Sequence, residues 1–310
     1  DALPIWLLHN YGAIMETTQQ QHYQEWLLSA VNPGIIELNV VSCRGSRPYD
    51  YLLYSDEVPR RNDGRIRDHI LKRYRHLEYG GWWCSGIELL TVKPALWGCF
   101  KPDRPRLHPD KPLKRIKYEH PPRTPTGVFA LALPSQIAEG IASRYGLLSS
   151  FRLYQSMYNH SGESSSLFWE WVLNTPQLPI IITEGAKKAG ALLTAGYCAI
   201  ALPGVSSGYR LHNSDSVKPY RKLIPELEIL ARNGRKFNLA FDQDSKRKTI
   251  EKVGQAQERL GYLLKEAGCQ VNVINWNPIL GKGADDLIVN HGSEARSEER
   301  RVGKECRSRW

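Results

Sequence analysis

The sequence predicts an α/β protein in which a parallel sheet with helices on both faces follows a smaller, basic α+β domain. Three short apolar runs rich in branched side chains, residues 178–183, 198–202 and 237–241, have the length and composition of buried strands. A helix-like segment, residues 186–195, separates the first two runs. Short buried strands that alternate with helices are typical of a parallel sheet covered by helices.

The polar stretch at residues 159–166 has the composition of a linker. We therefore expect a basic, Trp-rich α+β domain at residues 1–165 and the α/β domain at residues 166–292. Residues 293–310 lack a core-forming pattern and resemble read-through into cloning-vector sequence, so we exclude them from the fold prediction.

Apolar spacing predicts the remaining elements of the α/β part. A helix is expected at residues 219–233, with Gly234 as its C-terminal stop. Its apolar face would carry Leu223, Leu227 and Leu230. A longer amphipathic helix follows the third strand and ends at Gly268, and residues 270–275 form a fourth strand. The stripe of that helix comprises Ile250, Val253, Leu260, Leu263, Leu264 and Ala267.

The N-terminal part is expected to contain short elements. They are a helix at 22–29, a strand at 35–41, a basic turn at 60–65, a helix at 66–74 and a helix at 135–145 with Ser135 as its N-cap. Prolines exclude a long helix from residues 100–123 and favour extended segments there. We expect the clustered Trp82, Trp83 and Trp97 to contribute to the core rather than to a binding surface.

Acidic residues directly follow two of the predicted strands. Glu184 comes after the first strand, and Asp242 and Asp244 come after the third. Because working residues gather at the carboxyl ends of parallel strands, we expect these carboxylates to converge at one edge of the sheet. Carboxylate oxygens are ligands that Mg²⁺ prefers. The alternative is a helix N-terminal carboxylate at Glu184 and ordinary turn or capping residues at Asp242 and Asp244.

These segments resemble a known family. A Glu-Gly after the first strand and an Asp-x-Asp after the third, with an acidic turn downstream, resemble the TOPRIM fold of bacterial primases, topoisomerases and some nucleases. The segments TEGAKKA at 183–189, ALPGVSSG at 201–208 and FDQD at 241–244 are similar to the TOPRIM-like domain of phage- and plasmid-type primases. The upstream region resembles the amino-terminal part of cyanobacterial plasmid replication proteins.

The resemblance implies a role in plasmid or phage DNA replication. The α/β domain would be a cytoplasmic, primase-type nucleotidyltransferase that uses Mg²⁺ or Mn²⁺, nucleoside triphosphates and single-stranded DNA, with a helicase module or partner. Asp242 and Asp244 would hold the metal ion, and Glu184 would bind metal or transfer a proton. In the turn at residues 281–287 the resemblance also makes Lys282, Asp285 and Asp286 site candidates, with Asp286 as a further metal ligand and Lys282 as a phosphate-binding residue. The alternative is a helix N-cap. The zinc module of bacterial-type primases is not recognisable upstream.

Basic residues could bind the phosphates of such substrates. The formal net charge is +10, from 42 basic and 32 acidic side chains, which suits a polyanionic partner. Lys187 and Lys188 lie beside Glu184, where an exposed helix face is the alternative. Upstream, the candidates are Lys101, Arg104, Arg106, Lys114, Arg115 and Lys117, beside Tyr118. A solvated basic loop would explain the same run.

Several classes of protein are not indicated. No apolar run approaches the length of a membrane span, so no membrane partner is expected. The six cysteines show no zinc-type spacing, and free thiols in a reducing cytoplasm are the simpler interpretation. Two alternatives to a primase remain. One is a TOPRIM nuclease that uses the same carboxylates, and the other is a non-catalytic replication-initiator domain that binds DNA.

Overall fold

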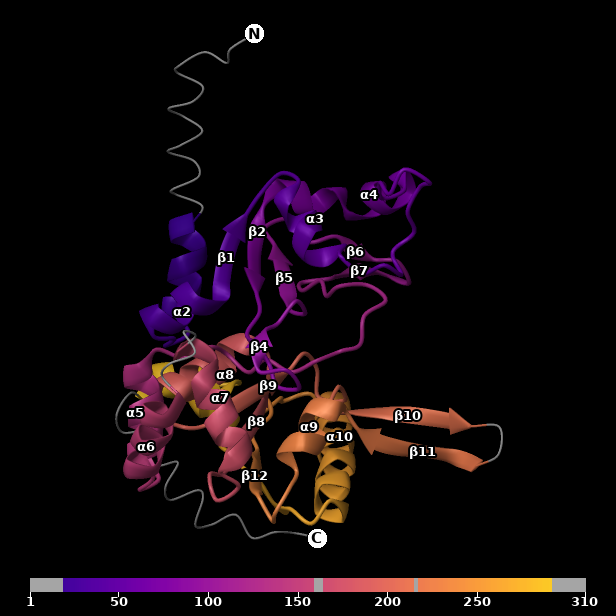
Figure 1. Ribbon diagram of the computed structural model, residues 1–310. Coiled ribbons are helices and arrows are strands. Elements are labelled where there is room, and N and C mark those ends of the chain that lie inside the picture. Colours follow the sequence, from indigo (N-terminus) through magenta and orange to yellow (C-terminus); the bar gives the residue numbers. More distant parts are fainter. Residues whose placement is uncertain (1–18, 159–163, 215–216, 292–310) are drawn as a thin grey trace. The chain divides into compact units, whose positions relative to one another are not determined.

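The computed structural model describes residues 19–158, 164–214 and 217–291 (Figure 1). The chain divides into two units. The first combines residues 1–28, 39–85 and 96–125, and the second combines residues 29–38, 86–95 and 126–310. The second unit therefore begins well upstream of the expected boundary at residue 165. The expected linker falls largely, and the expected vector-derived tail wholly, outside the described residues.

The first unit is built on a three-stranded antiparallel sheet in the order β1-β2-β5. Its elements are a helix at 19–27, β1 Val40–Cys43, α3 Arg47–Leu52, α4 Asp68–Tyr74, the 3-10 helix η1 Arg75–Tyr79, β2 Gly81–Cys84, β5 Cys99–Pro102, β6 Leu107–His108 and β7 Lys111–Arg115. Trp83 and Phe100 pack into the core against α3 and η1. Extended structure in the proline-rich stretch is confirmed, since β5, β6 and β7 all lie there.

The second unit contains the predicted parallel sheet, which has four strands in the order β13-β12-β8-β9 and is flanked by helices. Its elements from residue 164 are α7 Ser164–Asn174, β8 Ile180–Glu184, α8 Ala186–Thr194, β9 Ala199–Leu202, β10 Tyr209–Ser214, β11 Val217–Leu223, α9 Pro225–Leu230, β12 Lys236–Leu239, α10 Arg247–Glu266, β13 Gln270–Val273, η3 Pro278–Leu280 and a helix at 284–291. The mixed α/β class, the four strands and the helices α8 and α10 agree with the prediction.

Segments upstream of residue 164 complete this unit. They are α2 Pro33–Asn39, β3 Ile87–Glu88, β4 Lys93–Pro94, α5 Ser135–Arg144 and α6 Leu148–Tyr158. Phe129 bridges to Ala201 of β9 through two backbone hydrogen bonds of 2.8 and 3.0 Å. The indole of Trp169 in α7 donates to the Leu131 carbonyl oxygen at 2.7 Å. These buried contacts explain why residues 126–158 belong with the parallel sheet.

The strand predicted at residues 35–41 is mostly a helix, and this prediction was wrong. Asn32 accepts the Gly34 amide at 2.9 Å, as residues that cap helices do, and Pro33 occupies the first turn of α2. Ile35 and Ile36 are both buried. Neighbouring residues on a strand point to opposite faces, so burial of both fits a helix better.

The helix predicted at residues 219–233 is only partly present. Its first part is strand β11, which pairs antiparallel with β10 in a two-stranded arm (Figure 1). Only α9 is helical, and it begins at Pro225. Two smaller corrections concern helix details: Pro134 rather than Ser135 occupies the N-cap of α5, and Ile250 on α10 is exposed.

Two of the three clustered tryptophans belong to the core, as predicted, and the third is only half-buried. Trp82 and Trp83 are buried, and the half-buried Trp97 stacks on the His120 ring with centroids 5.3 Å apart. The cysteines within the described ranges, all buried, are free thiols. None of the helices within these ranges has both the length and the apolar character needed to span a bilayer.

Candidate active site at the edge of the parallel sheet

Strands β8 and β12 bring two carboxylates to the same edge of the parallel sheet. The two strands pair with Ile182 beside Leu239, and the Ala240 amide donates to the Ile182 carbonyl oxygen at 2.9 Å. Glu184 is the last residue of β8, and Asp242 follows shortly after β12. Their charges interact, as the sequence predicted from the strand ends.

Glu184 lies in a setting that disfavours its charge. Burial is the main cause that raises its pKa, and the neighbouring Asp242 carboxylate adds to it. The positive charges of Lys188, Lys282 and Lys252 offset these effects only in part. Glu184 therefore keeps its proton to higher pH than an exposed glutamate does.

Lys188 lies among several of the acidic groups of this edge. Gly185 has a φ of 87°, which turns the chain from β8 directly into α8 and places Lys188 in its first turn. The Lys188 Nζ atom is 3.1 Å from Asp242 Oδ1, and both side chains are four-fifths buried. Burial alone would lower the pKa of Lys188, but the carboxylates of Asp242, Asp285 and Glu184 outweigh it and raise the pKa.

The loop at residues 281–283 lies at the same edge. The Gln243 amide donates to the Lys282 carbonyl oxygen at 2.8 Å, which joins this loop to the loop after β12. The Lys282 Nζ atom lies 3.0 Å from Asp244 Oδ2. The backbone amide of Lys246 and the Lys282 side chain both lower the pKa of Asp244. Asp244 is therefore a firmly ionised carboxylate.

Asp285 and Asp286 have different surroundings. Asp286 Oδ2 accepts the Gly283 amide at 3.0 Å at the start of the helix 284–291, which is a capping contact. Asp285 instead faces Lys188, and burial raises its pKa while Lys188 and the half-buried Lys187 counteract that rise. Gly283 passes so near Lys188 that a Cβ atom there would overlap the lysine side chain. Asp285 thus interacts with Lys188 of the predicted site, whereas Asp286 caps the helix.

A hard divalent cation suits these donors chemically, although the lysines now neutralise them. Within residues 19–158, 164–214 and 217–291, no group of three or more His, Cys, Asp or Glu side chains is arranged to hold a metal ion. Ion pairs with Lys188 and Lys282 occupy Asp242 and Asp244. The donors are nonetheless all oxygens, and the repulsion between Glu184 and Asp242 is a charge imbalance that a divalent cation would relieve.

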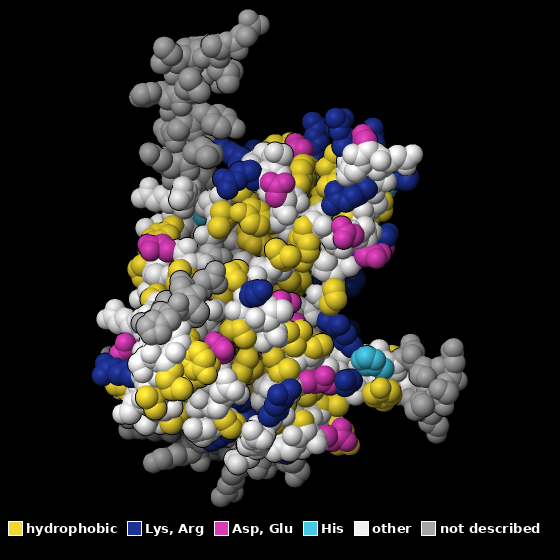
Figure 2. Space-filling view, in the orientation of Figure 1, with side chains coloured by type: hydrophobic (Ala, Val, Ile, Leu, Met, Phe, Trp, Pro, Cys, Tyr) yellow, Lys and Arg dark blue, Asp and Glu magenta, His cyan; other side chains and the backbone are white. Residues whose placement is uncertain are grey.

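The upstream basic candidates separate into groups in the first unit. Arg106 is engaged internally, because its guanidinium donates to both carboxylate oxygens of Glu119 at 2.6 and 2.9 Å. Lys114 and Arg115 are exposed on β7. Lys101, Arg104 and Lys117 line a cleft of the first unit. On the face shown in Figure 2, basic side chains lie among acidic and apolar ones rather than in one continuous patch.

Sequence reasoning missed Lys252 and Glu119. Lys252 on α10 acts electrostatically on Glu184, but the pattern of the helix alone did not show which face meets the sheet edge. Glu119 is buried beside Arg106 and His76, with 3.2 Å between His76 Nε2 and a Glu119 carboxylate oxygen. The sequence did offer one signal for Glu119, because a single glutamate within a basic run is a candidate ion-pair partner.

Comparison with known proteins adds two similarities. Residues 168–295 match the model of a family described as a domain of unknown function (DUF3854), so the candidate site lies entirely within that match. The chain is also 53% identical over 282 residues to an uncharacterized protein of Picosynechococcus sp. strain PCC 7002. That similarity covers 89% of this chain but only 27% of the relative, so the chain spans about a quarter of its length. No solved structure matches significantly.

Proposed function

We propose that the acidic edge of the parallel sheet is the active site of a DNA replication enzyme from a plasmid or phage. The activity would be that of a primase-type nucleotidyltransferase, which joins nucleoside triphosphates on single-stranded DNA. In this proposal the second unit has a TOPRIM-like arrangement, and a helicase module or partner works with it in the cytoplasm. The observation that carries the proposal is the convergence of Glu184 and Asp242 from two neighbouring parallel strands.

The residues of the edge would divide the work as follows. Asp242 and Asp244 would hold Mg²⁺ or Mn²⁺, which when bound neutralises and aligns the phosphates of the nucleotide. Glu184 would accept or return a proton, a role that suits its raised pKa. Lys188 and Lys282 would lose their carboxylate partners to the metal ion, which frees two ammonium groups for phosphate.

A second candidate function is favoured by the same ion pairs. Lys188 and Lys282 neutralise Asp242 and Asp244 without any metal ion. A non-catalytic replication-initiator domain could also retain carboxylates that are neutralised by lysines in this way. In that case the edge would contribute to stability, and binding of DNA would be the whole activity.

The experiment that tests the proposal is primer synthesis by the full chain on single-stranded DNA. Labelled nucleoside triphosphates are supplied with Mg²⁺ or Mn²⁺, and wild type is compared with Asp242→Asn. We expect labelled primers from wild type and a loss of about a hundredfold or more with Asp242→Asn, because a metal-binding carboxylate is removed. Asp56→Asn is the matched control, since Asp56 is exposed in the other unit.

The outcomes separate the three functions. Primers that require both nucleotides and Asp242 support the primase proposal. A shortened template without new primers would assign the same carboxylates to a nuclease. DNA binding with neither product, unchanged by Asp242→Asn, would favour the initiator domain and contradict the catalytic proposal.

A further inference from the structure

The first unit contains a cleft with a volume of about 710 Å³. This volume lies within the range of sites that bind small molecules. The helix at residues 19–27, the start of β2, and β5 with the turn after it contribute to its walls. The lining groups that decide its chemistry are Arg44, Tyr79, Trp82, Arg104, Lys117 and Tyr118.

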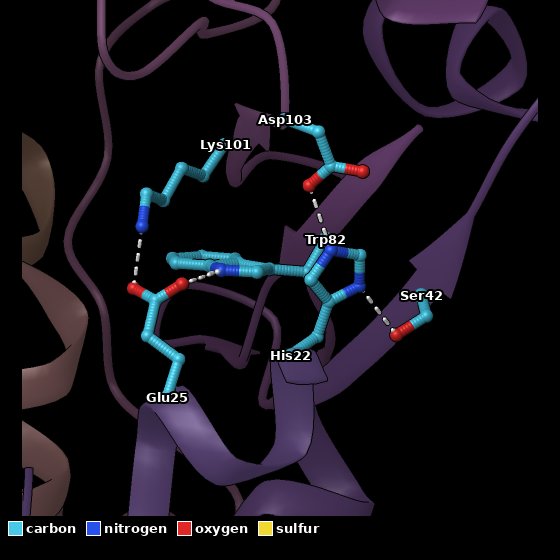
Figure 3. A network of polar contacts seen from close by, with 6 residues as sticks. All are labelled: His22, Glu25, Ser42, Trp82, Lys101 and Asp103. Atoms are coloured by element: carbon cyan, nitrogen blue, oxygen red, sulfur yellow. Dashed lines mark hydrogen bonds and ion pairs between the residues drawn. The ribbon is translucent and has the colours of Figure 1, made fainter. Parts of the chain in front are cut away.

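One wall of the cleft is held rigid by contacts around Trp82 (Figure 3). The Trp82 indole nitrogen donates to Glu25 Oε2 at 3.0 Å, and the other oxygen of Glu25 lies 2.7 Å from Lys101 Nζ. Behind it, Trp26 packs edge-on against the Trp82 ring with centroids 5.1 Å apart. Glu25 and Lys101 thus satisfy each other, and the wall they form is already in place before a ligand binds.

A second set of contacts, around His22, positions the turn after β5 (Figure 3). His22 Nδ1 lies 2.9 Å from Ser42 Oγ, and Nε2 lies 2.8 Å from Asp103 Oδ1. The Asp103 amide also donates to the Gly80 carbonyl oxygen at 2.9 Å. These bonds hold the turn that presents Arg104, whose guanidinium lies 4.2 Å from the centre of the Tyr79 ring.

The remaining lining groups are cations and exposed aromatic rings. Both acidic side chains of the lining, Glu25 and Asp103, already have a lysine or histidine partner. In the part of the chain that the structure describes, Arg44, Arg104 and Lys117 form no ion pair with an acidic residue. The rings of Tyr79 and Tyr118 remain 49% and 41% exposed. The cleft therefore offers positive charge and flat apolar surface together.

We propose that this cleft binds a nucleoside phosphate, with the phosphate on Arg44, Arg104 and Lys117 and the base against Tyr79 or Tyr118. Phosphate needs cationic donors, and a base gains about 1–3 kcal/mol from stacking on an aromatic side chain. The nucleotide has two possible sources, a free nucleoside triphosphate or one unit of single-stranded DNA. This inference rests on the proposed function in one respect, which is that a nucleoside triphosphate and single-stranded DNA are the two sources considered.

The test measures binding rather than activity. Fluorescence anisotropy of the full chain is recorded with a labelled ATP analogue and, separately, with a labelled oligothymidylate. We expect Arg104→Glu combined with Lys117→Glu to weaken binding by about tenfold or more, because two charge-assisted contacts are lost. The control is Lys72→Glu combined with Arg75→Glu, which makes the same change in net charge at exposed positions of the same unit. Its affinity should stay within about twofold of wild type.

Tyr118 provides a test that does not alter charge. Tyr118→Ala should weaken binding, whereas Tyr118→Phe keeps the ring and should retain it. Loss of affinity for the ATP analogue alone identifies a free triphosphate as the ligand, and loss for the oligonucleotide identifies a unit of the strand. Cleft variants that bind both probes as well as the control would overturn the proposal. Inorganic triphosphate that competes as well as ATP would overturn the role of the rings.

Recording the anisotropy without a divalent cation separates this inference from the proposed function. The proposed active site belongs to the other unit and uses a metal ion, so under these conditions binding of both probes is assigned to the cleft. Intact binding without primer synthesis in wild type would contradict the catalytic proposal alone. Primer synthesis with cleft variants that bind normally would contradict the cleft alone.

Discussion

The charge of Glu184 is set by its neighbours rather than by its residue type. Its carboxyl group is largely withdrawn from water and close to Asp242, and both effects raise the pKa. Lys188 experiences the opposite balance, because the surrounding carboxylates stabilise its charge despite burial. The edge of the sheet therefore combines a carboxyl group that resists ionisation with an ammonium group that resists neutralisation.

This balance predicts how Glu184→Gln changes stability with pH. Because the folded-state pKa is raised above that of the unfolded chain, the stability linked to this group is full below the usual pKa of glutamate and is lost as the pH rises through the folded-state value. Glutamine resembles the protonated form at every pH. We therefore expect the variant to have a higher free energy of unfolding than wild type at neutral pH and an equal one in acid.

Chemical denaturation across this pH range measures the difference. Glu251→Gln is the matched control, because Glu251 is exposed on α10 and, within the described ranges, forms its ion pair with Arg247 on the same helix. A Glu184→Gln variant less stable than wild type at neutral pH would show that the charged form is favoured in the fold, contrary to the assigned direction.

The shared position of Glu184 and Asp242 at one edge of the sheet was predicted, whereas their side-chain contacts were not. Glu184 and Asp242 follow strands whose apolar runs are unambiguous, and parallel pairing then requires their proximity. The ion pair of Lys188 with Asp242 depends on how α8 starts after Gly185, and the sequence left an exposed helix face equally open. Side-chain pairing of this kind is decided by backbone geometry that a residue pattern does not specify.

Among the elements of the second unit, the ends of α7 and α9 and the segment before β8 are connected by the buried side chain of Arg235. Its guanidinium, only 1% exposed, donates to the carbonyl oxygens of Val172, Thr175, Leu178 and Leu230 at 2.7–3.1 Å. These acceptors lie at the ends of α7 and α9 and before β8, while Arg235 itself precedes β12. Among the described residues this guanidinium has no carboxylate partner, and the backbone carbonyl dipoles stabilise its charge.

We predict that Arg235→Met destabilises the second unit by about 3–5 kcal/mol, because it leaves several buried carbonyl oxygens without donors. The free energy of unfolding by urea measures the effect. Arg232→Met is the control, since Arg232 is exposed three positions earlier and its replacement should change stability by less than about 0.5 kcal/mol. Equal effects of the two substitutions would show that the buried hydrogen bonds contribute little.

The elements that were predicted correctly have a clear spacing of apolar residues, and the elements that were predicted wrongly do not. β8, β9 and β12 are short runs of buried residues between turn residues, and α10 keeps its helical spacing over many turns. Residues 219–223 instead join an edge strand whose partner is β10. Pro219 suggested the start of a helix there, yet a proline is also tolerated in an edge strand. Only knowledge of the β10 pairing distinguishes these two outcomes.

At the scale of the whole molecule, the basic excess does not translate directly into a binding surface. The net charge is +10, but Arg106 is used against Glu119 and Lys101 against Glu25. Lys114 and Arg115 are different, because both are exposed on β7. The distribution of ion pairs, which the composition does not reveal, therefore narrows the basic run to a few groups that can meet a polyanion.

We predict that Lys114→Glu combined with Arg115→Glu weakens binding of single-stranded DNA and flattens its salt dependence. Each contact of a basic residue with phosphate in a single strand contributes about 0.7 to the slope of log affinity against log salt, so loss of two contacts should reduce the slope by about 1.4. Affinity measured over a range of salt concentrations gives this slope.

Lys72→Glu combined with Arg75→Glu again serves as the charge-matched control. If the slope falls equally in both variants, the effect comes from net charge and not from β7. If the slope of the β7 variant is unchanged, β7 does not contact DNA. Binding by the first unit would then be assigned to the cleft.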